Sequence, residues 1–273
     1  MSIYFASDQH ICLTHPERGR RFARFLGLLD PHSDSLVIAG DLCDFWFVSR
    51  ESHSPEAAAE PGLIALRKFI DAGGQVTLLP GNHDMHLEEF YRRVLGLSFS
   101  DDLTLELKPA DQAGSPAITR VVHGHLLGGR SKWKGLMEGR GFLKSFEKLP
   151  EPMADRLAGL LQKYNSRNRH EDNLRHFRVY ESHVRNAKPP CGSHYDIYIL
   201  GHVHQTICTE VTIESGDPSK SDKTTLMVVL GHWFRRASWF RIDPDLTWNF
   251  WFWDDDAPEP EKVSDHRIEP PKA

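Results

Sequence analysis

Five short polar segments, each placed directly after an apolar run, constrain this chain more than any other feature. They read Asp8-Gln9-His10, Gly40-Asp41-Leu42-Cys43-Asp44, Gly81-Asn82-His83-Asp84, His123-Gly124-His125 and Gly201-His202-Val203-His204. Short continuous apolar runs are typical of buried strands. Sites of open α/β folds lie at the carboxyl ends of such strands. The pattern therefore predicts an α/β fold whose strand ends bring several Asp, Asn and His side chains together.

The order of predicted elements supports this fold class. In the first half, helical and strand-like stretches alternate, whereas the last part of the chain is mainly strand-like. We predict helices at 18–29, 63–71 and 87–95, and strands at 3–6, 36–39, 76–79, 120–122, 195–200, 224–230, 238–242 and 248–253. Residues 49–61 are polar with an Ala cluster and predict a loop. The sequence as a whole predicts an α/β sandwich.

Residues 130–190 interrupt the alternation and form a basic, helix-rich insertion. They carry 14 Lys and Arg against 7 Asp and Glu, within a chain whose formal net charge is -5. Three helical stretches are predicted, at 133–149, 153–164 and 173–187. An apolar stripe follows the second, at Met153, Leu157, Leu160, Leu161 and Tyr164. The stripe either faces a ligand groove or packs on the body, and a basic segment favours an anionic partner or a solvated surface.

The predicted domain organisation is one domain over 1–254, with the insertion at 130–190 inside it, and a tail at 255–273. The tail is rich in Pro and acidic residues, which predicts partial disorder. The acidic balance outside the insertion argues against a nucleic-acid partner.

Cysteine use and hydropathy indicate the compartment. The four cysteines are far apart and form no Cys-x-x-Cys pair, so a zinc ribbon is not expected. The first residues carry no basic, apolar leader, and no run approaches the roughly 18 apolar residues of a membrane span. We therefore expect a cytoplasmic protein, with peripheral contact at the inner membrane as an open alternative.

Three of the segments offer candidate metal ligands; each signal is weak alone, since Asp-x-His occurs by chance and two histidines can be structural, but together they are strong. Asp8 and His10 are two residues apart, and so are His202 and His204; on an extended chain each pair points the same way. Asp41 follows Gly40 at a sharp turn, where its two oxygens suit a carboxylate that bridges two ions. The alternative for Asp41 is a helix N-cap.

The other two segments supply further candidates. Asn82 offers a neutral amide oxygen, and His83 is placed to protonate a leaving oxygen or hold a phosphate. Of His123 and His125 only one needs to be a ligand, so His125 is a candidate for substrate contact or for supporting a ligand. Asp44 fits a helix cap slightly better than a supporting role.

The chemistry of this donor set suggests a pair of metal ions. Asp, Asn and His without Cys favour Mn²⁺, Fe²⁺ or Zn²⁺ over Mg²⁺ alone. Two such ions side by side can activate water and hydrolyse a phosphate ester.

In their order, the five segments resemble the calcineurin-like metallophosphoesterase superfamily. The resemblance runs to about Trp253 and implies a four-layer α/β/β/α sandwich. It also implies hydrolysis by a hydroxide between two ions that attacks phosphorus in line. The implied ligands of the first ion are Asp8, His10, Asp41 and His204. Those implied for the second ion are Asp41, Asn82, His123 and His202.

A closer resemblance is to the UDP-2,3-diacylglucosamine diphosphatases of lipid A biosynthesis. It is carried by residues 40–46, by Leu149-Pro150 with Arg156-Leu157-Ala158, and by Val229-Leu230-Gly231-His232-Trp233. It implies a Mn²⁺ enzyme that cleaves a nucleotide-linked glycolipid at its pyrophosphate, with 130–190 as a helical lid. Cations of the lid would then face phosphates and its apolar stripe would face acyl chains. Arg130 and Lys132 are the substrate-binding candidates there.

The chain departs from that group at two positions, and these departures keep other functions open. The best-known members carry Arg where this chain has His83, and Asp where it has His125. The alternative is a metallophosphoesterase of soluble nucleotides or of other phosphodiesters and phosphomonoesters. A metal-binding scaffold without catalysis is a third hypothesis, which the intact ligand set disfavours.

Overall fold

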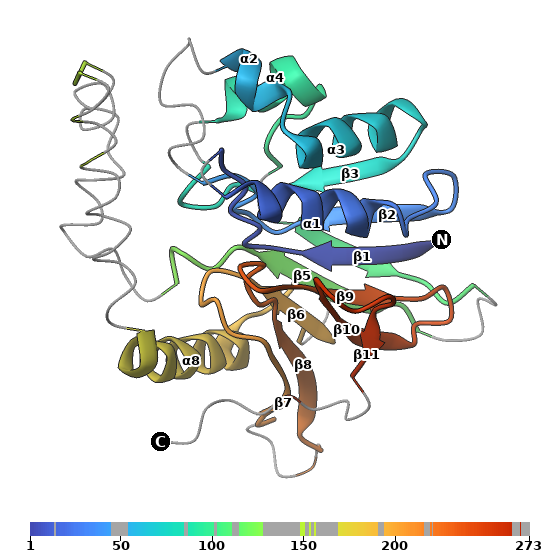
Figure 1. Cartoon of the computed structure of the whole chain (residues 1–273). Coiled ribbons are helices and arrows are strands. Elements are labelled where there is room, and N and C mark those ends of the chain that lie inside the picture. Colours follow the sequence, from blue (N-terminus) through green and yellow to red (C-terminus); the bar gives the residue numbers. More distant parts are fainter. Residues whose placement is uncertain are drawn as a thin grey trace.

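The structure is a computed structural model of the chain, and it folds as two sheets flanked by helices (Figure 1). It describes residues 1–13, 15–44, 54–84, 87–100, 103–110, 115–127, 148–150, 153, 156, 169–190, 194–215, 219, 221–263 and 268. The elements are β1 (Ser2–Ala6), α1 (Pro16–Leu26), β2 (Asp34–Ile38), α2 (Ser54–Ala58), α3 (Pro61–Asp71), β3 (Gln75–Leu78), α4 (Glu88–Leu95), β4 (Leu103–Leu107), β5 (Ala117–Val122), α8 (Arg169–Asn186), β6 (Ile197–Leu200), β7 (Ile207–Ile213), β8 (Lys223–Val229), β9 (Arg236–Ile242), β10 (Trp248–Asp254) and β11 (Glu261–Lys262).

Both sheets are mixed, with a parallel centre. The first has the order β11-β10-β9-β1-β2-β3, in which β1, β2 and β3 run parallel and β9 to β11 are antiparallel to their neighbours. The second has the order β4-β5-β6-β8-β7, with β5, β6 and β8 parallel and antiparallel strands at both edges. Strands β1, β2, β3, β5 and β6 are those that the five polar segments follow.

Three hydrophobic clusters fix the order of the layers. The first joins α1, α3 and α4 to one face of the first sheet, and the second lies between the two sheets. The third joins α8 to the outer face of the second sheet. Neighbouring residues of β1 separate accordingly, since Tyr4 belongs to the first cluster and Phe5 to the second. The α/β class predicted from the sequence is confirmed, and both faces of the first sheet are covered.

Local sequence explains where the outer helices begin and end. Helix α1 begins with Pro16 at its first turn and buries Phe22 and Phe25. Helix α3 begins after Glu60, whose carboxylate accepts hydrogen bonds from the backbone N–H groups of Gly62 and Leu63. The two helices pack against each other over the sheet.

Helix α8 is a layer of the body. Tyr180 and Val184 are buried in the third cluster, with Phe177 packed against it. The apolar spacing of the predicted helix at 173–187 therefore reflects core packing on β6 to β8. The predicted helix at 133–149 falls outside the described residues apart from 148 and 149, and residues 153 and 156 are the described part of that at 153–164. The apolar stripe along 153–164 therefore stays a prediction.

The structure adds elements that the sequence did not predict. Strands β4 and β7 form the two edges of the second sheet, where β4 pairs with β5 and β7 pairs with β8. Helix α2 lies within the predicted loop at 49–61. In the tail, β11 pairs with β10, and Ile268 exchanges backbone hydrogen bonds with Cys208. Among the described residues, no helix is both long and apolar enough to cross a membrane.

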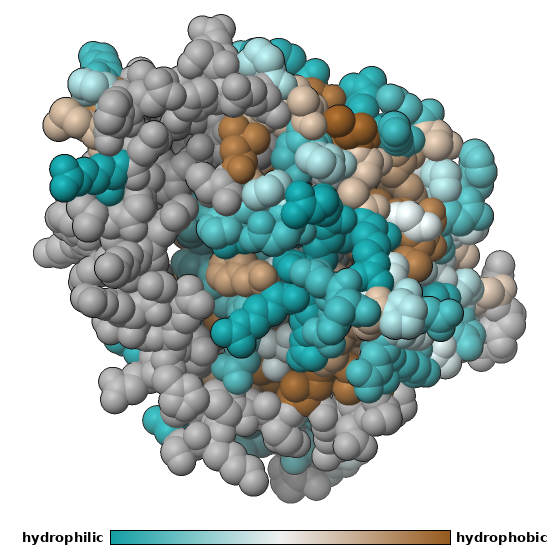
Figure 2. Space-filling view, in the orientation of Figure 1, coloured by the Kyte–Doolittle hydropathy of each residue, from teal (hydrophilic) through white to brown (hydrophobic). Residues whose placement is uncertain are grey.

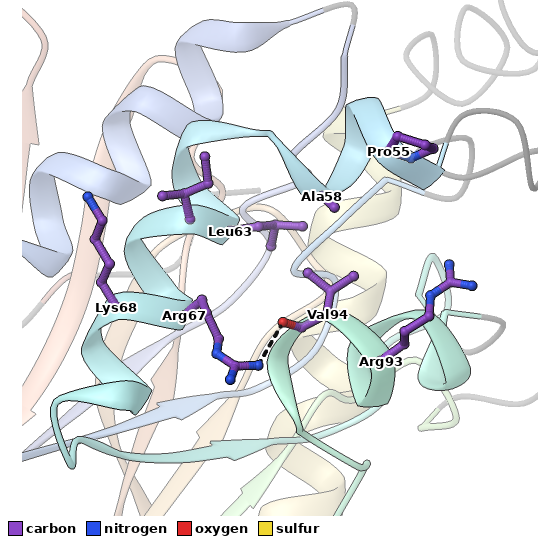
Figure 3. Close-up of a pocket in the computed structure, with 8 residues that line it drawn as sticks. Pro55, Ala58, Leu63, Arg67, Lys68, Arg93 and Val94 are labelled. Atoms are coloured by element: carbon purple, nitrogen blue, oxygen red, sulfur yellow. Dashed lines mark hydrogen bonds between the residues drawn. The ribbon is translucent and has the colours of Figure 1, made fainter.

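The described surface in this view is mainly hydrophilic, with hydrophobic residues in separate patches (Figure 2). A cavity of about 540 Å³ lies among α2, α3 and α4, lined by Leu63, Arg67 and Val94 among others (Figure 3). The Arg67 guanidinium donates to the Val94 carbonyl at 3.2 Å and pairs with Asp71 at 2.8 Å. None of the predicted metal ligands lines this cavity.

Candidate metal centre

Loops after the parallel strands of both sheets meet at one edge of the sandwich. Backbone hydrogen bonds connect them: Asp8 N–H donates to the Gly40 carbonyl at 3.1 Å, and Gly201 N–H donates to the His123 carbonyl at 3.1 Å. His10 N–H donates to the Asp41 carbonyl at 3.0 Å. The polar segments therefore form one continuous network of loops.

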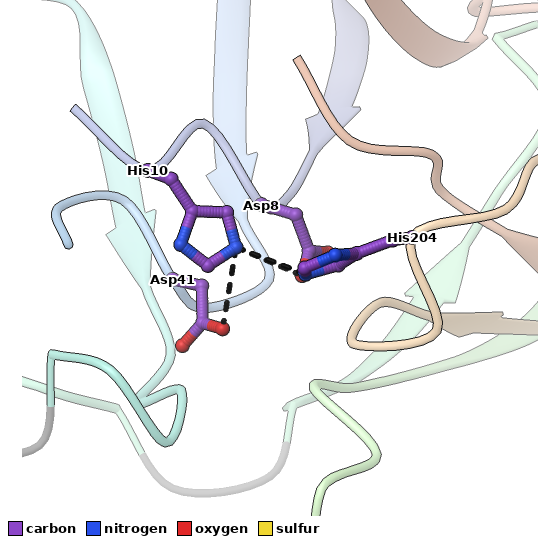
Figure 4. Close-up of side chains that lie close together, drawn as sticks. All are labelled: Asp8, His10, Asp41 and His204. Carbon is purple, nitrogen blue, oxygen red and sulfur yellow. Dashed lines mark hydrogen bonds and ion pairs between the residues drawn. The ribbon is translucent and has the colours of Figure 1, made fainter. Parts of the chain in front are cut away.

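A first group of four side chains converges in this network: Asp8, His10, Asp41 and His204 (Figure 4). The two imidazole Nε2 atoms of His10 and His204 lie 3.0 Å apart. Asp8 Oδ1 is 3.3 Å from His204 Nε2, and Asp41 Oδ2 is 3.7 Å from His10 Nε2. Two carboxylates and two imidazoles facing one point suit a divalent transition-metal ion.

A second group lies on the other side of Asp41 and contains Asp41, His123 and His202. His123 Nε2 is 3.4 Å from Asp41 Oδ2 and 3.3 Å from the Asn82 amide oxygen. His123 Nδ1 lies 2.8 Å from the Ala39 carbonyl, which can only accept, so Nδ1 carries the proton and Nε2 is left as a donor atom for a metal.

Asp41 belongs to both groups, and its two oxygens differ. Oδ1 accepts a hydrogen bond from His83 N–H at 2.8 Å. Oδ2 is buried and has no hydrogen-bond partner among the described residues. A buried, unpaired carboxylate oxygen is costly unless a cation satisfies it. This oxygen, facing His10 on one side and His123 on the other, fits a ligand shared by two metal ions.

Burial and neighbouring charges also shift the pKa values of other site residues. Burial opposes ionisation of Asp8, but hydrogen bonds with His10 and His204 outweigh it and hold its pKa below the ordinary value. For His123, the lowering of the pKa by burial is outweighed by the negative charge of nearby Asp41, which raises the pKa to about 10. Without a cation, the charge of Asp41 thus draws a proton onto His123, whereas burial lowers the pKa of His10.

The backbone of the metal loops is left-handed. Asp8, His10, Asp41, His202 and His204 have φ values of 56°, 48°, 54°, 71° and 60°. The prediction that each Asp or His pair shares a direction on an extended chain is therefore wrong about the backbone. Left-handed non-glycine residues cost of the order of 1–3 kcal/mol each and gather at functional sites. The hydrogen-bonded loops hold them in place here.

Two glycines give the carboxylates room. A Cβ on Gly81 would overlap the Asp41 carboxylate, and a Cβ on Gly201 would overlap Ser7 Oγ and come within 2.8 Å of Asp8 Oδ2. Ser7 Oγ in turn donates to Asp8 Oδ2 at 2.6 Å. Gly201 therefore makes room for Ser7 and for the Asp8 carboxylate, which would hold the metal.

Asp44 and Asp84 support the centre in different ways. Asp84 accepts backbone N–H groups of Gly81 and Leu42 at 2.7 and 2.9 Å and so ties two metal loops together. Burial and the charge of Asp41 raise the pKa of Asp84 to about 7. Asp44 Oδ1 lies 3.0 Å from His83 Nδ1, which favours the supporting role; residues 45–50, on which a helix cap would act, lie outside the described residues. No local sequence pattern could reveal this pair, since the residues are 39 positions apart.

Asp44 is buried and His83 is half-buried, and their pKa values are shifted in opposite directions. Burial lowers the pKa of His83, but the charge of Asp41 and the bond to Asp44 outweigh it and raise the pKa to about 9. Against its own burial, the bond to His83 lowers the pKa of Asp44 to about 2. Since a carboxylate can only accept, His83 donates through Nδ1, and Nε2 is left for a substrate oxygen.

The remaining candidates fall around the second group or outside the described residues. The His125 ring centroid is 5.3 Å from that of His123 and 6.3 Å from that of His202, so His125 adjoins the group. Arg130 and Lys132 lie outside the described residues. Sequence reasoning missed His176 of α8, whose ring centroid is 5.9 Å from that of His202, because its helix is far along the chain.

Known proteins that resemble this chain share its family and most of its length. The profile of the calcineurin-like phosphoesterase family matches residues 1–206. A UDP-2,3-diacylglucosamine hydrolase of Xanthomonas campestris pv. campestris is 27% identical over 90% of this chain and 96% of its own length. One from Stenotrophomonas maltophilia is also 27% identical, over 89% and 95%. A solved structure of a protein of unknown function from Aquifex aeolicus matches at 17% identity over 75% of this chain and 80% of its own, with a TM-score of 0.33.

Proposed function

The chain belongs to the calcineurin-like phosphoesterases, a family of metal-dependent phosphoester hydrolases, and from this membership we propose that it cleaves a phosphoester or diphosphate bond with two divalent ions. The observation that carries the proposal is Asp41 Oδ2, which is buried, accepts no hydrogen bond from the described residues and belongs to both ligand groups. The first ion would be held by Asp8, His10, Asp41 and His204. The second would be held by Asp41, Asn82, His123 and His202.

We propose Mn²⁺ as the metal, with Fe²⁺ and Zn²⁺ as alternatives that the same donors accept. When bound, two such ions supply Lewis acidity and lower the pKa of the water that attacks phosphorus. The chain's own part is to hold the ligands, through the left-handed loops and the clamp of Asp84, before substrate arrives. Such preorganisation lowers the barrier because no reorganisation is needed during the reaction.

His83 is the proposed proton donor. Its Nδ1 is bound to Asp44, its side chain is 27% exposed, and its backbone N–H is fixed by Asp41. The imidazole is therefore anchored beside the metal ligands and open to solvent on one side. A histidine in this position can give a proton to the leaving oxygen or hold a phosphate oxygen.

For the substrate, we propose UDP-2,3-diacylglucosamine or a similar lipid-linked diphosphate. The support is similarity over nine tenths of the chain to proteins named UDP-2,3-diacylglucosamine hydrolases. His125, Arg130 and Lys132 are the proposed contacts to its phosphates. A basic lid with an apolar stripe would then bring a cytoplasmic protein to the membrane surface, as a peripheral contact.

The test is turnover of UDP-2,3-diacylglucosamine with Mn²⁺, with products read by mass spectrometry, beside bis(p-nitrophenyl) phosphate as a generic diester. UMP and an acylated sugar 1-phosphate, formed with Mn²⁺ and abolished by EDTA, would support the lipid substrate. Turnover of the generic diester alone would keep the metal-dependent hydrolase and point to soluble nucleotides or other phosphoesters. No metal-dependent turnover of either would contradict the proposal.

A further inference from the structure

Arg18 of α1 connects three parts of the site that are distant in sequence. Its Nη1 donates to the His10 carbonyl at 3.0 Å and lies 3.8 Å from Asp44 Oδ2. Its guanidinium carbon lies 4.3 Å from the centroid of the Phe234 ring. The Arg18 side chain is 13% exposed, so these contacts are largely shielded from water. None of the five polar segments includes this residue.

The two oxygens of Asp44 are thereby divided between two partners. Oδ1 accepts from His83 Nδ1 at 3.0 Å, and Oδ2 faces Arg18. A buried carboxylate needs a partner on each oxygen to keep one orientation. Arg18 is itself fixed, since its bond to the His10 carbonyl anchors one end and the Phe234 ring supports its face. A series of contacts from Arg18 through Asp44 to His83 therefore connects α1 to the site.

We propose that Arg18 is a positioning residue of the reaction, which holds Asp44 so that Asp44 can hold His83 toward the substrate. The inference rests on the proposed function, because it assigns His83 as the proton donor. Near the site, the polar contacts of Arg18 are to the His10 backbone carbonyl and to Asp44 rather than to a ligand side-chain atom, so it would act through Asp44. Its removal should leave the metal ligands in place and loosen the His83 imidazole.

The test compares leaving groups. Bis(p-nitrophenyl) phosphate releases a weakly basic phenolate that needs little help from an acid, whereas diphenyl phosphate releases a more basic one that does. Because general acids contribute typically 10²- to 10⁴-fold, a loosened His83 should cost Arg18→Ala about tenfold or more on diphenyl phosphate and less than about threefold on the activated ester. Arg18→Lys should recover part of the loss.

The matched control is Arg20→Ala, an exposed residue of the same type in the same helix. Arg20→Ala should match the wild type on both esters. If Arg18→Ala does not fold, Arg18→Gln keeps a donor for the His10 carbonyl while removing the charge that faces Asp44. Equal loss on both esters, loss of bound metal, or no loss at all would overturn the inference.

A double-mutant cycle tests whether Arg18 acts through His83. Adding Arg18→Ala to His83→Gln should cost no further rate on diphenyl phosphate, because the group being positioned is already gone. If the two losses multiply instead, Arg18 acts by another route.

A readout independent of activity separates this inference from the proposed function. In the Zn²⁺-loaded protein, the His83 Nδ1–H proton, assigned by its absence in His83→Gln, should be visible by NMR in the wild type and Arg20→Ala. It should broaden or disappear in Arg18→Ala. An unchanged signal would overturn the inference even in an active enzyme. Loss of the signal in a protein without any phosphoesterase activity would uphold the positioning and count against the proposed function alone.

Discussion

At the scale of single residues, Asp41 determines what the site can do. One of its oxygens accepts a hydrogen bond from the backbone N–H of His83, and the other accepts none from the part of the chain that the structure describes and faces the imidazoles of both ligand groups. His83, held by Asp44, stands beside the His10 ring at a centroid distance of 4.7 Å. Metal binding and proton donation are thus assigned to different side chains, which predicts that they can be separated by mutation.

Asp41→Asn should remove the shared ligand while keeping the size of the side chain. The amide oxygen can still accept from His83 N–H, but the amide nitrogen cannot replace a carboxylate oxygen at two ions. We expect loss of bound metal and a fall in turnover of about 10³-fold or more, since metal Lewis acidity supplies several kcal/mol. Elemental analysis and turnover of the exposed control Asp71→Asn should match the wild type. Two ions retained by Asp41→Asn with full turnover would refute the assignment.

His83→Gln should lower turnover without lowering the metal content. The first and second ligand groups keep all their members, so the metal content should remain that of the wild type. Turnover should fall by about 10²- to 10⁴-fold, the usual contribution of a general acid. Elemental analysis and steady-state kinetics of the same preparation measure both. Loss of metal in this variant would place His83 among the ligands.

At this scale, the sequence predicted which residues form the ligand groups better than it predicted their backbone conformation. Both ligand groups consist of residues in the predicted segments, because strand ends with Asp, Asn and His carry a local signal. The left-handed backbone of the ligands is set by hydrogen bonds between loops, such as Asp8 N–H to Gly40, which local spacing does not encode. Arg18 and His176 were missed because each reaches the site from a helix whose pattern reports only its packing.

At the scale of elements, α8 is the helix whose place the sequence left open. Tyr180 is fully buried against the second sheet, and its hydroxyl donates to the Gly201 carbonyl at 3.2 Å, next to a metal loop. Amphipathic spacing is the same for a helix over a substrate groove and for a helix on a core, so only tertiary contacts distinguish them. Sequence reasoning also missed the edge strands β4 and β7. In β4, half-buried and exposed side chains alternate, and a short run of this kind resembles a loop.

Tyr180→Ala should destabilise the protein by about 3–5 kcal/mol, as expected for truncation of a large buried aromatic side chain. Tyr180→Phe is the matched control, since it keeps the ring and removes one hydrogen bond, at a cost of about 0.5–1.5 kcal/mol. Denaturant unfolding of the three proteins gives both values. A Tyr180→Ala protein as stable as the wild type would mean that α8 does not belong to the core.

At the scale of the whole molecule, the centre joins the two sheets. Asp8 and Asp41 follow strands of the first sheet, and His123, His202 and His204 follow strands of the second. Because the ligands come from both sheets, the ions would bind only the folded chain, in which the two sheets are packed together. The sequence predicted individual strands and one site, but the pairing of these strands into two sheets depends on contacts between distant segments.

Removal of metal should therefore lower the stability of the whole domain. A ligand at 100 times its Kd stabilises the folded state by about 2.7 kcal/mol, which corresponds to a Tm shift of about 5–10 °C for a protein of this size. Thermal unfolding with Mn²⁺ and after EDTA treatment measures the shift, and Asp41→Asn should show almost none. An equal response of both proteins would mean that the ions stabilise some other part of the chain.

The most direct test of the dinuclear site is a titration of the metal-free wild-type protein with Mn²⁺, in which bound metal and turnover of bis(p-nitrophenyl) phosphate are measured on the same samples. The geometry around Asp41 predicts two ions per chain, with turnover reaching its plateau as the second ion binds. A plateau at one ion per chain, or undiminished turnover in the metal-free protein, would contradict the shared role of Asp41.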